Sequence, residues 1–226
     1  MFASIGSDRR FWSAVRGARA LSRLSSVVEM PEEIVLPTDR PSIIAANHSS
    51  LFDLVAALVV LGHYGIPARI GVNARFFSNP ASGAFLNGIG CIPFAKGQGH
   101  IAEQEMVEAL ASGQATAMMP EGRISRIGDQ THGVGQGRPG ISRIARAAGA
   151  AIVPVGFAFA DETWVPGTTL PKVRMGKHKV IASIGAPIEL TTDEHIDNAQ
   201  IVMAAIGDLV VHGRDTGTAK GPTNQL

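Results

Sequence analysis

A histidine and an aspartate five positions apart stand directly after an apolar run in this chain. The run Ser42–Ala46 is followed by Asn47, His48 and a Ser-Ser pair, and Asp53 comes after two apolar residues. This pattern predicts a strand that ends in a loop and then enters a helix. Open α/β folds place their chemistry at such strand ends. With an ordinary pKa of about 6.5, His48 can accept a proton near neutral pH, while Asp53 orients its ring.

Ser50 and Asp53 also fit a second interpretation. The pattern Ser50-x-x-Asp53 resembles a capping box, in which the carboxylate satisfies backbone amides at the start of a helix. His48 would then be a hydrogen-bonded core residue. The local pattern alone leaves both interpretations open, because such short motifs occur by chance.

A second apolar run also ends in charged residues. Ala115–Met119 leads into Pro120-Glu121-Gly122-Arg123. Together, Asn-His-x-x-x-x-Asp and Pro-Glu-Gly-Arg resemble the glycerolipid acyltransferase family, which includes the lysophosphatidate acyltransferases. Three further blocks follow the order of that family, and all five span roughly residues 42 to 190: Gly90–Lys96, Val153–Val155 and Ile184–Ile188.

The resemblance implies an O-acyltransferase. Such an enzyme moves a fatty acyl group from a thioester, on CoA or acyl carrier protein, to a hydroxyl of a lysophospholipid such as 1-acyl-glycerol-3-phosphate. It implies no cofactor, with His48 as general base and Asp53 as its orienting acid. Backbone amides near the helix start, or the Gly122 amide, are expected to stabilise the oxyanion. The expected substrate-binding residues are Lys96, Glu121, Gly122, Arg123 and, as a weaker candidate, Arg75, with Asn47 and Ser50 in support.

Two positions depart from the family pattern. The third block of the family usually reads Pro-Glu-Gly-Thr-Arg-Ser, so Arg123 stands one position early, and Lys96 stands where the family usually has arginine. Lysine holds a phosphate as a point charge without the bidentate fork of arginine. A different lipid or glycolipid acceptor therefore stays open. For Glu121, a buried ion pair that holds the loop is an equal alternative to substrate contact.

The composition excludes several classes of protein. The chain has 226 residues, a formal net charge of +1 and one cysteine, which argues against nucleic-acid binding and excludes an intramolecular disulfide framework. Hydrophobic residues make up 45% and charged residues 17%, which fits a protein that touches a membrane. No apolar run reaches the ~18 residues of a spanning helix. The histidines show no ligand spacing, so we expect no metal site.

The N-terminal segment predicts a basic amphipathic helix over residues 1–30. Arg9, Arg16 and Arg23 fall on one stripe, and Phe11 and Val15 begin the opposite, apolar side. Such a helix suits the surface of an anionic membrane, and we expect a peripheral protein on the cytoplasmic face. Packing of the apolar side on the domain is the main alternative, and a targeting presequence is a third.

Strands and helices alternate along the rest of the chain, which predicts a single α/β domain with a central, mostly parallel (mixed) sheet flanked by helices. We expect an acyltransferase domain over 31–212 and a flexible tail over 213–226. A hairpin-like pair is expected at 172–175 and 179–184. The pattern Gly135-x-Gly137-x-x-Gly140 lacks a preceding strand, so a loop beside the site is a better interpretation than nucleotide binding.

Two other functions remain open from the sequence. A catalytically silent protein that binds lipid or acyl carrier protein would need neither His48 nor Asp53, and both are present. A thioester hydrolase would use the same base with water in place of the alcohol. No Gly-x-Ser-x-Gly elbow occurs, which disfavours an acyl-serine route.

Overall fold

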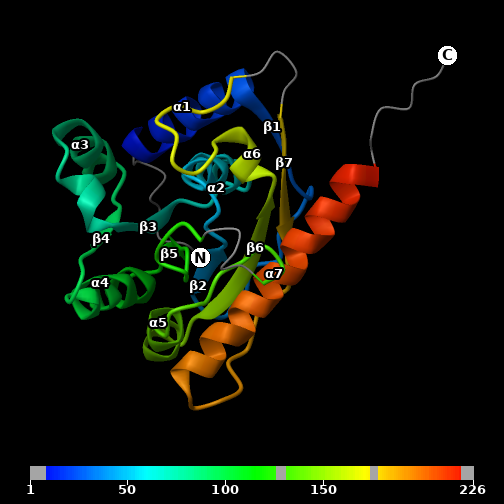
Figure 1. Cartoon of the computed structure of the whole chain (residues 1–226). Coiled ribbons are helices and arrows are strands. Elements are labelled where there is room, and N and C mark those ends of the chain that lie inside the picture. Colours follow the sequence, from blue (N-terminus) through cyan, green and yellow to red (C-terminus); the bar gives the residue numbers. More distant parts are fainter. Residues whose placement is uncertain (1–8, 126–130, 174–177, 220–226) are drawn as a thin grey trace.

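The computed structural model of the chain describes residues 9–125, 131–173 and 178–219. A central seven-stranded sheet has the order β1-β7-β6-β2-β5-β3-β4, and every pairing is parallel except that of β6 with β7 (Figure 1). The expected single α/β domain with a mostly parallel, mixed sheet is confirmed. The strands are β1 (Ser26–Glu29), β2 (Ser42–Ala46), β3 (Ala68–Asn73), β4 (Ile92–Phe94), β5 (Ala115–Met118), β6 (Ala151–Ala158) and β7 (His178–Ile184).

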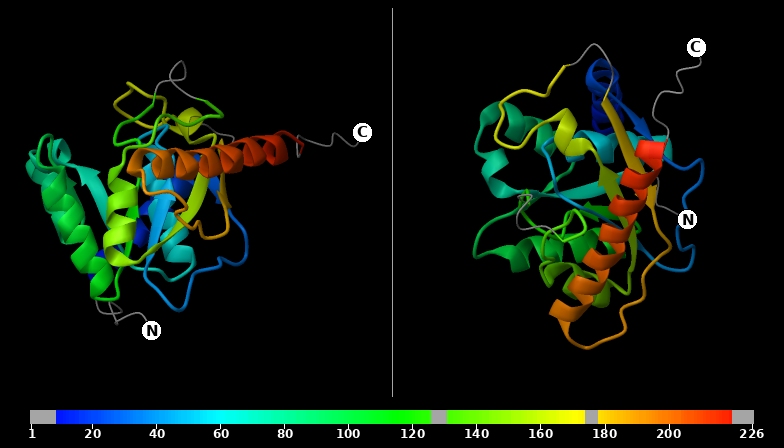
Figure 2. Two further views of the ribbon diagram at one scale, coloured as in Figure 1. Left: turned by 90° about the horizontal axis from the view of Figure 1, so that it is seen from below. Right: turned by 45° about the vertical axis from the view of Figure 1, so that its right-hand side comes forward.

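Helices cover both faces of this sheet (Figures 1 and 2). The side chains of β2 alternate between the faces: Ile44 joins the core beneath α1 and α2, and Ile43 joins the core beneath α4, α5 and α7. All five residues of β2 are buried, as expected for a central parallel strand. The helices are α1 (Arg9–Ser25), α2 (Phe52–His63), the 3-10 helix η1 (Ala74–Phe77), α3 (Pro80–Gly88), α4 (Gly99–Ala111), α5 (Gly140–Ala148), α6 (Ala160–Thr163) and α7 (His195–Ala219).

The N-terminal helix packs on the domain through its apolar side. Phe11 and Val15 of α1 are each 2% exposed, and a side-chain carbon at Gly62 of α2 would collide with Val15. Arg9, Arg16 and Arg23 are exposed on the other side of the helix. In the part of the chain that the structure describes, no helix is both long and apolar enough to cross a bilayer.

The sheet begins earlier than the sequence indicated. β1 follows α1 without a break and pairs with β7 in parallel, so residues 26–29 belong to the domain rather than to a separate N-terminal helix. The expected hairpin is also wrong. β7 pairs with β6 and β1, and Lys172 and Val173 lie in no strand. The remaining residues of that expected arm, 174 and 175, lie outside the described residues.

The expected tail from residue 213 is wrong over its first seven positions, because α7 continues to Ala219. Gly213 lies against Ala158 of β6, where an added side-chain carbon would come within 3.1 Å of the Ala158 Cβ. The small residue therefore lets the helix approach the sheet closely, and this packing stabilises a segment of low helix propensity. Residues 220–226 lie outside the described residues.

Candidate active site

The loop between β2 and α2 builds a buried network around one carboxylate. Asp53 is fully buried, and its Oδ2 accepts hydrogen bonds from the backbone amides of Ser49 and Ser50, each at 2.7 Å. The same oxygen lies 3.0 Å from Nδ1 of His48. Asp53 therefore accepts two amides of the loop that leads into α2 and also holds the imidazole.

The hydrogen bonds of Asp53 set the tautomer of His48. Burial raises the pKa of the Asp53 carboxyl, although the hydrogen bond and charge of His48 and the two amides partly oppose this shift. Because Oδ2 accepts from both backbone amides, it is also the acceptor toward Nδ1, which therefore carries the proton and leaves Nε2 as the acceptor of the ring. The His48 side chain is 20% exposed and lines a cavity, so Nε2 can meet a substrate.

Asn47 and Ser50 brace this loop against distant elements. The Asn47 side-chain amide exchanges two hydrogen bonds with the backbone of Phe157 in β6, at 3.0 and 2.7 Å. The Ser50 hydroxyl donates to the Trp164 carbonyl at 2.6 Å and accepts from the Phe52 amide at 3.1 Å. Asn47 is 1% exposed and Ser50 is fully buried. Both residues support the position of His48, as expected.

Glu121 lies beneath the site rather than in it. It is 3% exposed, does not line the cavity, and its Oε1 accepts the His48 backbone amide at 2.7 Å. Its Oε2 accepts the Gly135 amide at 3.2 Å and the Ser125 hydroxyl. Both oxygens are thus occupied by hydrogen bonds within the protein, and the structure places Glu121 outside the cavity, away from the substrate contact that the sequence predicts. The alternative from the sequence was a buried ion pair that holds the loop. Glu121 does hold the loop, but it does so by accepting hydrogen bonds from two amides and a hydroxyl.

Burial raises the pKa of Glu121 to about 7, although the amides of His48 and Gly135 oppose this shift. Gly135 approaches so closely that an added side-chain carbon would come within 2.8 Å of Oε2. The contact with Glu121 thus explains why Gly135, the first glycine of the nucleotide-like pattern, has no side chain. The segment from 131 to α5 is a loop beside the site, as expected. Residues 126–130 lie outside the described residues.

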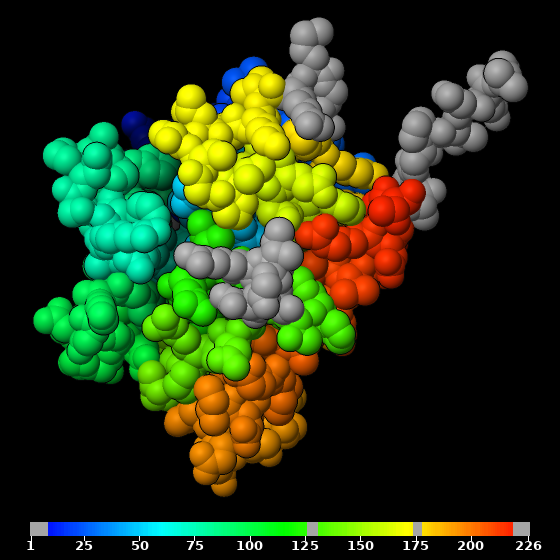
Figure 3. All heavy atoms as spheres, viewed as in Figure 1, coloured from blue at the N-terminus to red at the C-terminus, as the bar shows by residue number. Residues whose placement is uncertain are grey.

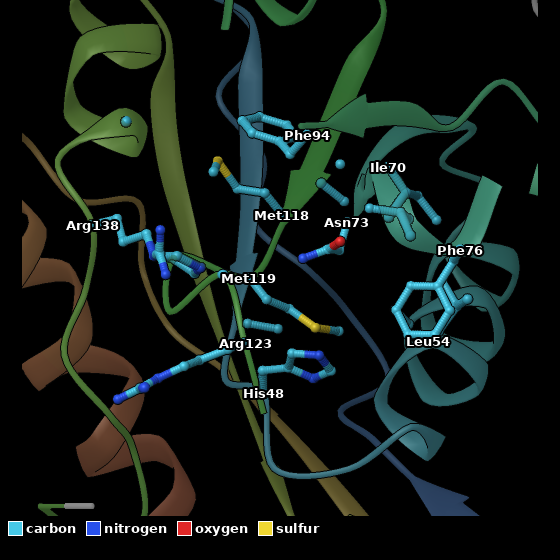
Figure 4. Close-up of a pocket in the computed structure, with 18 of the residues that line it drawn as sticks. His48, Leu54, Ile70, Asn73, Phe76, Phe94, Met118, Met119, Arg123 and Arg138 are labelled. Atoms are coloured by element: carbon cyan, nitrogen blue, oxygen red, sulfur yellow. The ribbon is translucent and has the colours of Figure 1, made fainter. Parts of the chain in front are cut away.

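A cavity of about 950 Å³ extends from His48 between α2, η1, α3 and the sheet. Its walls are mostly apolar, and the space-filling view shows a recess between the residues of η1 and α3 and the segment that follows β6 (Figure 3). Figure 4 shows Met119 beside the imidazole and Phe94 farther along the cavity. Other apolar lining residues include Leu51, Leu54, Ile70, Phe76, Phe85 and Leu86. Such a space suits a hydrocarbon chain.

Cations gather at the rim of this cavity. Lys96, Gly122 and Arg123, which the sequence predicts as substrate-binding residues, line it, and so do Arg138 and Arg143. Arg138 comes from the segment before α5, and Arg143 comes from α5 itself. No short sequence motif marked either residue. Arg75 does not lie at the cavity. It is exposed on η1, with its guanidinium 4.7 Å from the centre of the Phe76 ring, so the structure does not bring it together with the other predicted substrate-binding residues.

Three of the amides expected to stabilise an oxyanion already donate hydrogen bonds within the protein. The amides of Ser49 and Ser50 donate to Asp53, and the Gly122 amide donates to the Met119 carbonyl at 3.0 Å. Burial also raises the pKa of the Cys91 thiol to about 12, so this side chain stays protonated and is no nucleophile. In residues 9–125, 131–173 and 178–219, no three His, Cys, Asp or Glu side chains gather in a way that could hold a metal ion.

This combination defines an α/β enzyme with a histidine–carboxylate pair at the mouth of an apolar cavity. The chain belongs to the Acyltransferase family, whose model matches residues 27–158, and it is therefore an acyltransferase. The fold is similar to that of the 1-acyl-sn-glycerophosphate acyltransferase PlsC from Thermotoga maritima. The TM-score is 0.65 at 22% sequence identity, over 94% of this chain and 81% of that one. A search of curated proteins finds no match.

Proposed function

We propose that this acyltransferase moves a fatty acyl group from a thioester, on CoA or acyl carrier protein, to a hydroxyl of a lysophospholipid such as 1-acyl-glycerol-3-phosphate. The observation that carries the proposal is the His48–Asp53 pair at the mouth of an apolar cavity with a cationic rim. The similarity in fold to a 1-acyl-sn-glycerophosphate acyltransferase supports the same acceptor class.

In the proposed mechanism, His48 acts first as a base and then as an acid. Its Nδ1 proton points at Asp53, so Nε2 removes the proton of the acceptor hydroxyl as that oxygen attacks the thioester carbonyl. A carbon–oxygen bond forms, and collapse of the tetrahedral intermediate breaks the carbon–sulfur bond. The imidazolium, stabilised by Asp53, then returns the proton to the leaving thiolate. The products are an ester and a free thiol.

The cavity and its rim divide the substrates by chemistry. The apolar walls suit the fatty acyl chain, and the cations suit phosphate groups. The exposed arginines of α1 suit the anionic surface of a membrane, from which a lipid acceptor would come. The enzyme is thus proposed to work as a peripheral protein on the cytoplasmic face of the membrane, with no cofactor beyond its thioester substrate.

The first experiment measures thiol release from palmitoyl-CoA, with and without lysophosphatidate, for the wild type, His48→Ala and His100→Ala. His100 is exposed on α4 and does not line the cavity, so its variant is the matched control. The proposal expects release that depends on the acceptor and is lost only in His48→Ala. Release without an acceptor indicates a hydrolase. Release that survives in His48→Ala contradicts the mechanism.

If palmitoyl-CoA gives no release, palmitoyl-acyl carrier protein is tested in the same way with the same three proteins. Glycolipid and other lysophospholipid acceptors are then offered with each donor, because Lys96 and Arg123 depart from the family pattern. Failure with every pair would favour a silent binding protein over an enzyme of this specificity.

A further inference from the structure

The four cations at the rim of the cavity are held in different ways. Arg143 forms a bidentate ion pair with Glu103, with 2.7 Å between Nε and Oε2, so its fork is already used. Lys96 is an exposed point charge beyond β4. Figure 4 shows Arg123 directed away from the His48 ring, whereas Arg138 reaches from the segment before α5 toward the cavity.

Arg138 is fixed in place at three points. Its backbone amide donates to the Pro120 carbonyl at 2.9 Å, and its Nε donates to the Glu121 carbonyl at 3.1 Å. The side chain also packs against Gly122, where an added side-chain carbon would come within 2.9 Å of Nε. Within the described ranges, the hydrogen bonds of Arg138 involve its backbone amide and Nε, so both Nη atoms stay available to a ligand.

Glu121 connects Arg138 to the catalytic base. Its backbone carbonyl accepts from Nε of Arg138, and its side chain accepts from the backbone amide of His48 at 2.7 Å. The Ser125 amide, in the same loop, donates to the His48 carbonyl at 2.9 Å. The guanidinium of Arg138 and the imidazole of His48 are therefore both held by the loop that contains the buried Glu121, which fixes the span between them before any substrate binds.

From these contacts we infer that Arg138, rather than Arg123, anchors the phosphate of the lipid acceptor and so places the acceptor hydroxyl at His48. The inference rests on the proposed function and names the residue that selects an anionic acceptor. Two parallel Nη donors match the oxygens of a phosphate, and a guanidinium already fixed through Nε loses little conformational entropy on binding.

The kinetic test compares Arg138→Ala with Arg146→Ala, an exposed arginine of α5 that does not line the cavity. Loss of a hydrogen-bonded charge pair is expected to raise the KM for lysophosphatidate about 10- to 100-fold. The kcat should change less than about threefold, and the KM for palmitoyl-CoA should not change. Monoacylglycerol, the same acceptor without its phosphate, should be used equally by both variants. A raised KM for palmitoyl-CoA instead would assign Arg138 to the donor.

A second variant tests the geometry without removing the charge. Gly122→Ala leaves Arg138 in the chain, but its new Cβ would come within 2.9 Å of Nε, at a backbone φ of +66°, so the guanidinium must shift. It should raise the KM for lysophosphatidate as Arg138→Ala does, and the double variant should add little to either. An Arg138→Ala enzyme with an unchanged KM, or an equal loss of kcat with both acceptors, would overturn the inference.

Binding without turnover separates this inference from the proposed function. Lysophosphatidate should raise the melting temperature of the wild type and of Arg146→Ala, but not that of Arg138→Ala. If binding behaves so and no transfer occurs, the anchor stands and the proposed reaction fails. If lysophosphatidate stabilises the wild type and Arg138→Ala equally, or stabilises neither, the anchor fails whatever the transfer assay gives.

Discussion

Two loops meet at the active site, and they are built in opposite ways. In the loop after β2, Asn47, Ser50 and Asp53 are all at most 1% exposed, and their side chains are hydrogen-bonded. In the loop after β5, Gly122 and Arg123 are exposed, and Glu121 turns its carboxyl back beneath His48. The first loop fixes the proposed base, His48, before substrate arrives, whereas the second presents groups that a substrate can reach.

The difference separates chemistry from recognition. A base must be held within a few tenths of an ångström of its productive position, and buried hydrogen bonds provide that precision. Recognition of a charged lipid tolerates exposed side chains, provided that one cationic side chain, here that of Arg138, is held in position by the protein. The comparison therefore predicts that changes in the first loop reduce kcat or stability, and that changes at exposed positions of the second loop mainly affect KM.

The largest expected effect is that of Asp53→Asn. The substitution keeps the size of the side chain but removes the charge that selects the tautomer of His48, so we expect kcat to fall about 10³-fold. Steady-state kinetics measure this, with the exposed Asp215→Asn of α7 as control. A kcat within tenfold of the wild type would show that Asp53 serves only as a helix cap.

The next largest effect concerns Glu121 and the change of the free energy of unfolding with pH. Its folded-state pKa of about 7 lies above the ordinary 4.5, so the folded protein favours the protonated form. The contribution of Glu121 to stability is full below pH 4.5 and is lost as pH rises to 7, by about 3 kcal/mol. Urea unfolding of wild type and Glu121→Gln across this window should show a smaller decline in the variant.

The surface substitution Glu162→Gln on α6 is the control for that comparison. If wild type and Glu121→Gln lose stability equally between pH 4.5 and 7, another group titrates in this window and Glu121 is ionised throughout.

Asn47→Ala should have a smaller effect, on stability. The variant leaves the buried amide and carbonyl of Phe157 without their partner, which should reduce the free energy of unfolding by about 2 kcal/mol. Urea unfolding followed by tryptophan fluorescence measures this, with the exposed Asn87→Ala of α3 as control. Equal stability of the two variants would mean that the loop does not depend on β6.

Arg123→Ala should have the smallest effect. Because its side chain is directed away from His48, we expect the KM for lysophosphatidate to rise only about threefold. A change of this size corresponds to the small free energy that an exposed ion pair usually contributes. The same acceptor titration that tests Arg138 measures it. A rise as large as that of Arg138→Ala would mean that Arg123 turns into the cavity when the acceptor binds.

The parts of the site that sequence could predict are local. His48 and Asp53 are five positions apart, and the strand before them and the helix after them follow from apolar patterning. Arg138 was missed because its proposed role depends on a packed contact with Gly122 and Glu121, which no spacing shows. Arg75 was misplaced for the same reason: its neighbours in sequence line the cavity, but its own side chain points elsewhere.

The errors in the fold have a similar cause. The four residues of β1 continue an apolar helix pattern, and only their pairing with β7 makes them a strand. The end of α7 is rich in glycine and threonine, which favours a tail, yet the surface of β6 and β7 supports a helix there. In both places, contacts between distant segments override local propensity.

The pairing of β1 with β7 has a consequence for how this protein is made. Among the described strands, the first to leave the ribosome is hydrogen-bonded only to the last. While the chain grows, β1 must remain without its neighbour until almost the whole domain has been synthesised, and contacts of such long sequence separation form slowly. The nascent chain therefore exposes an unpaired strand edge until β7 has been synthesised and pairs with β1.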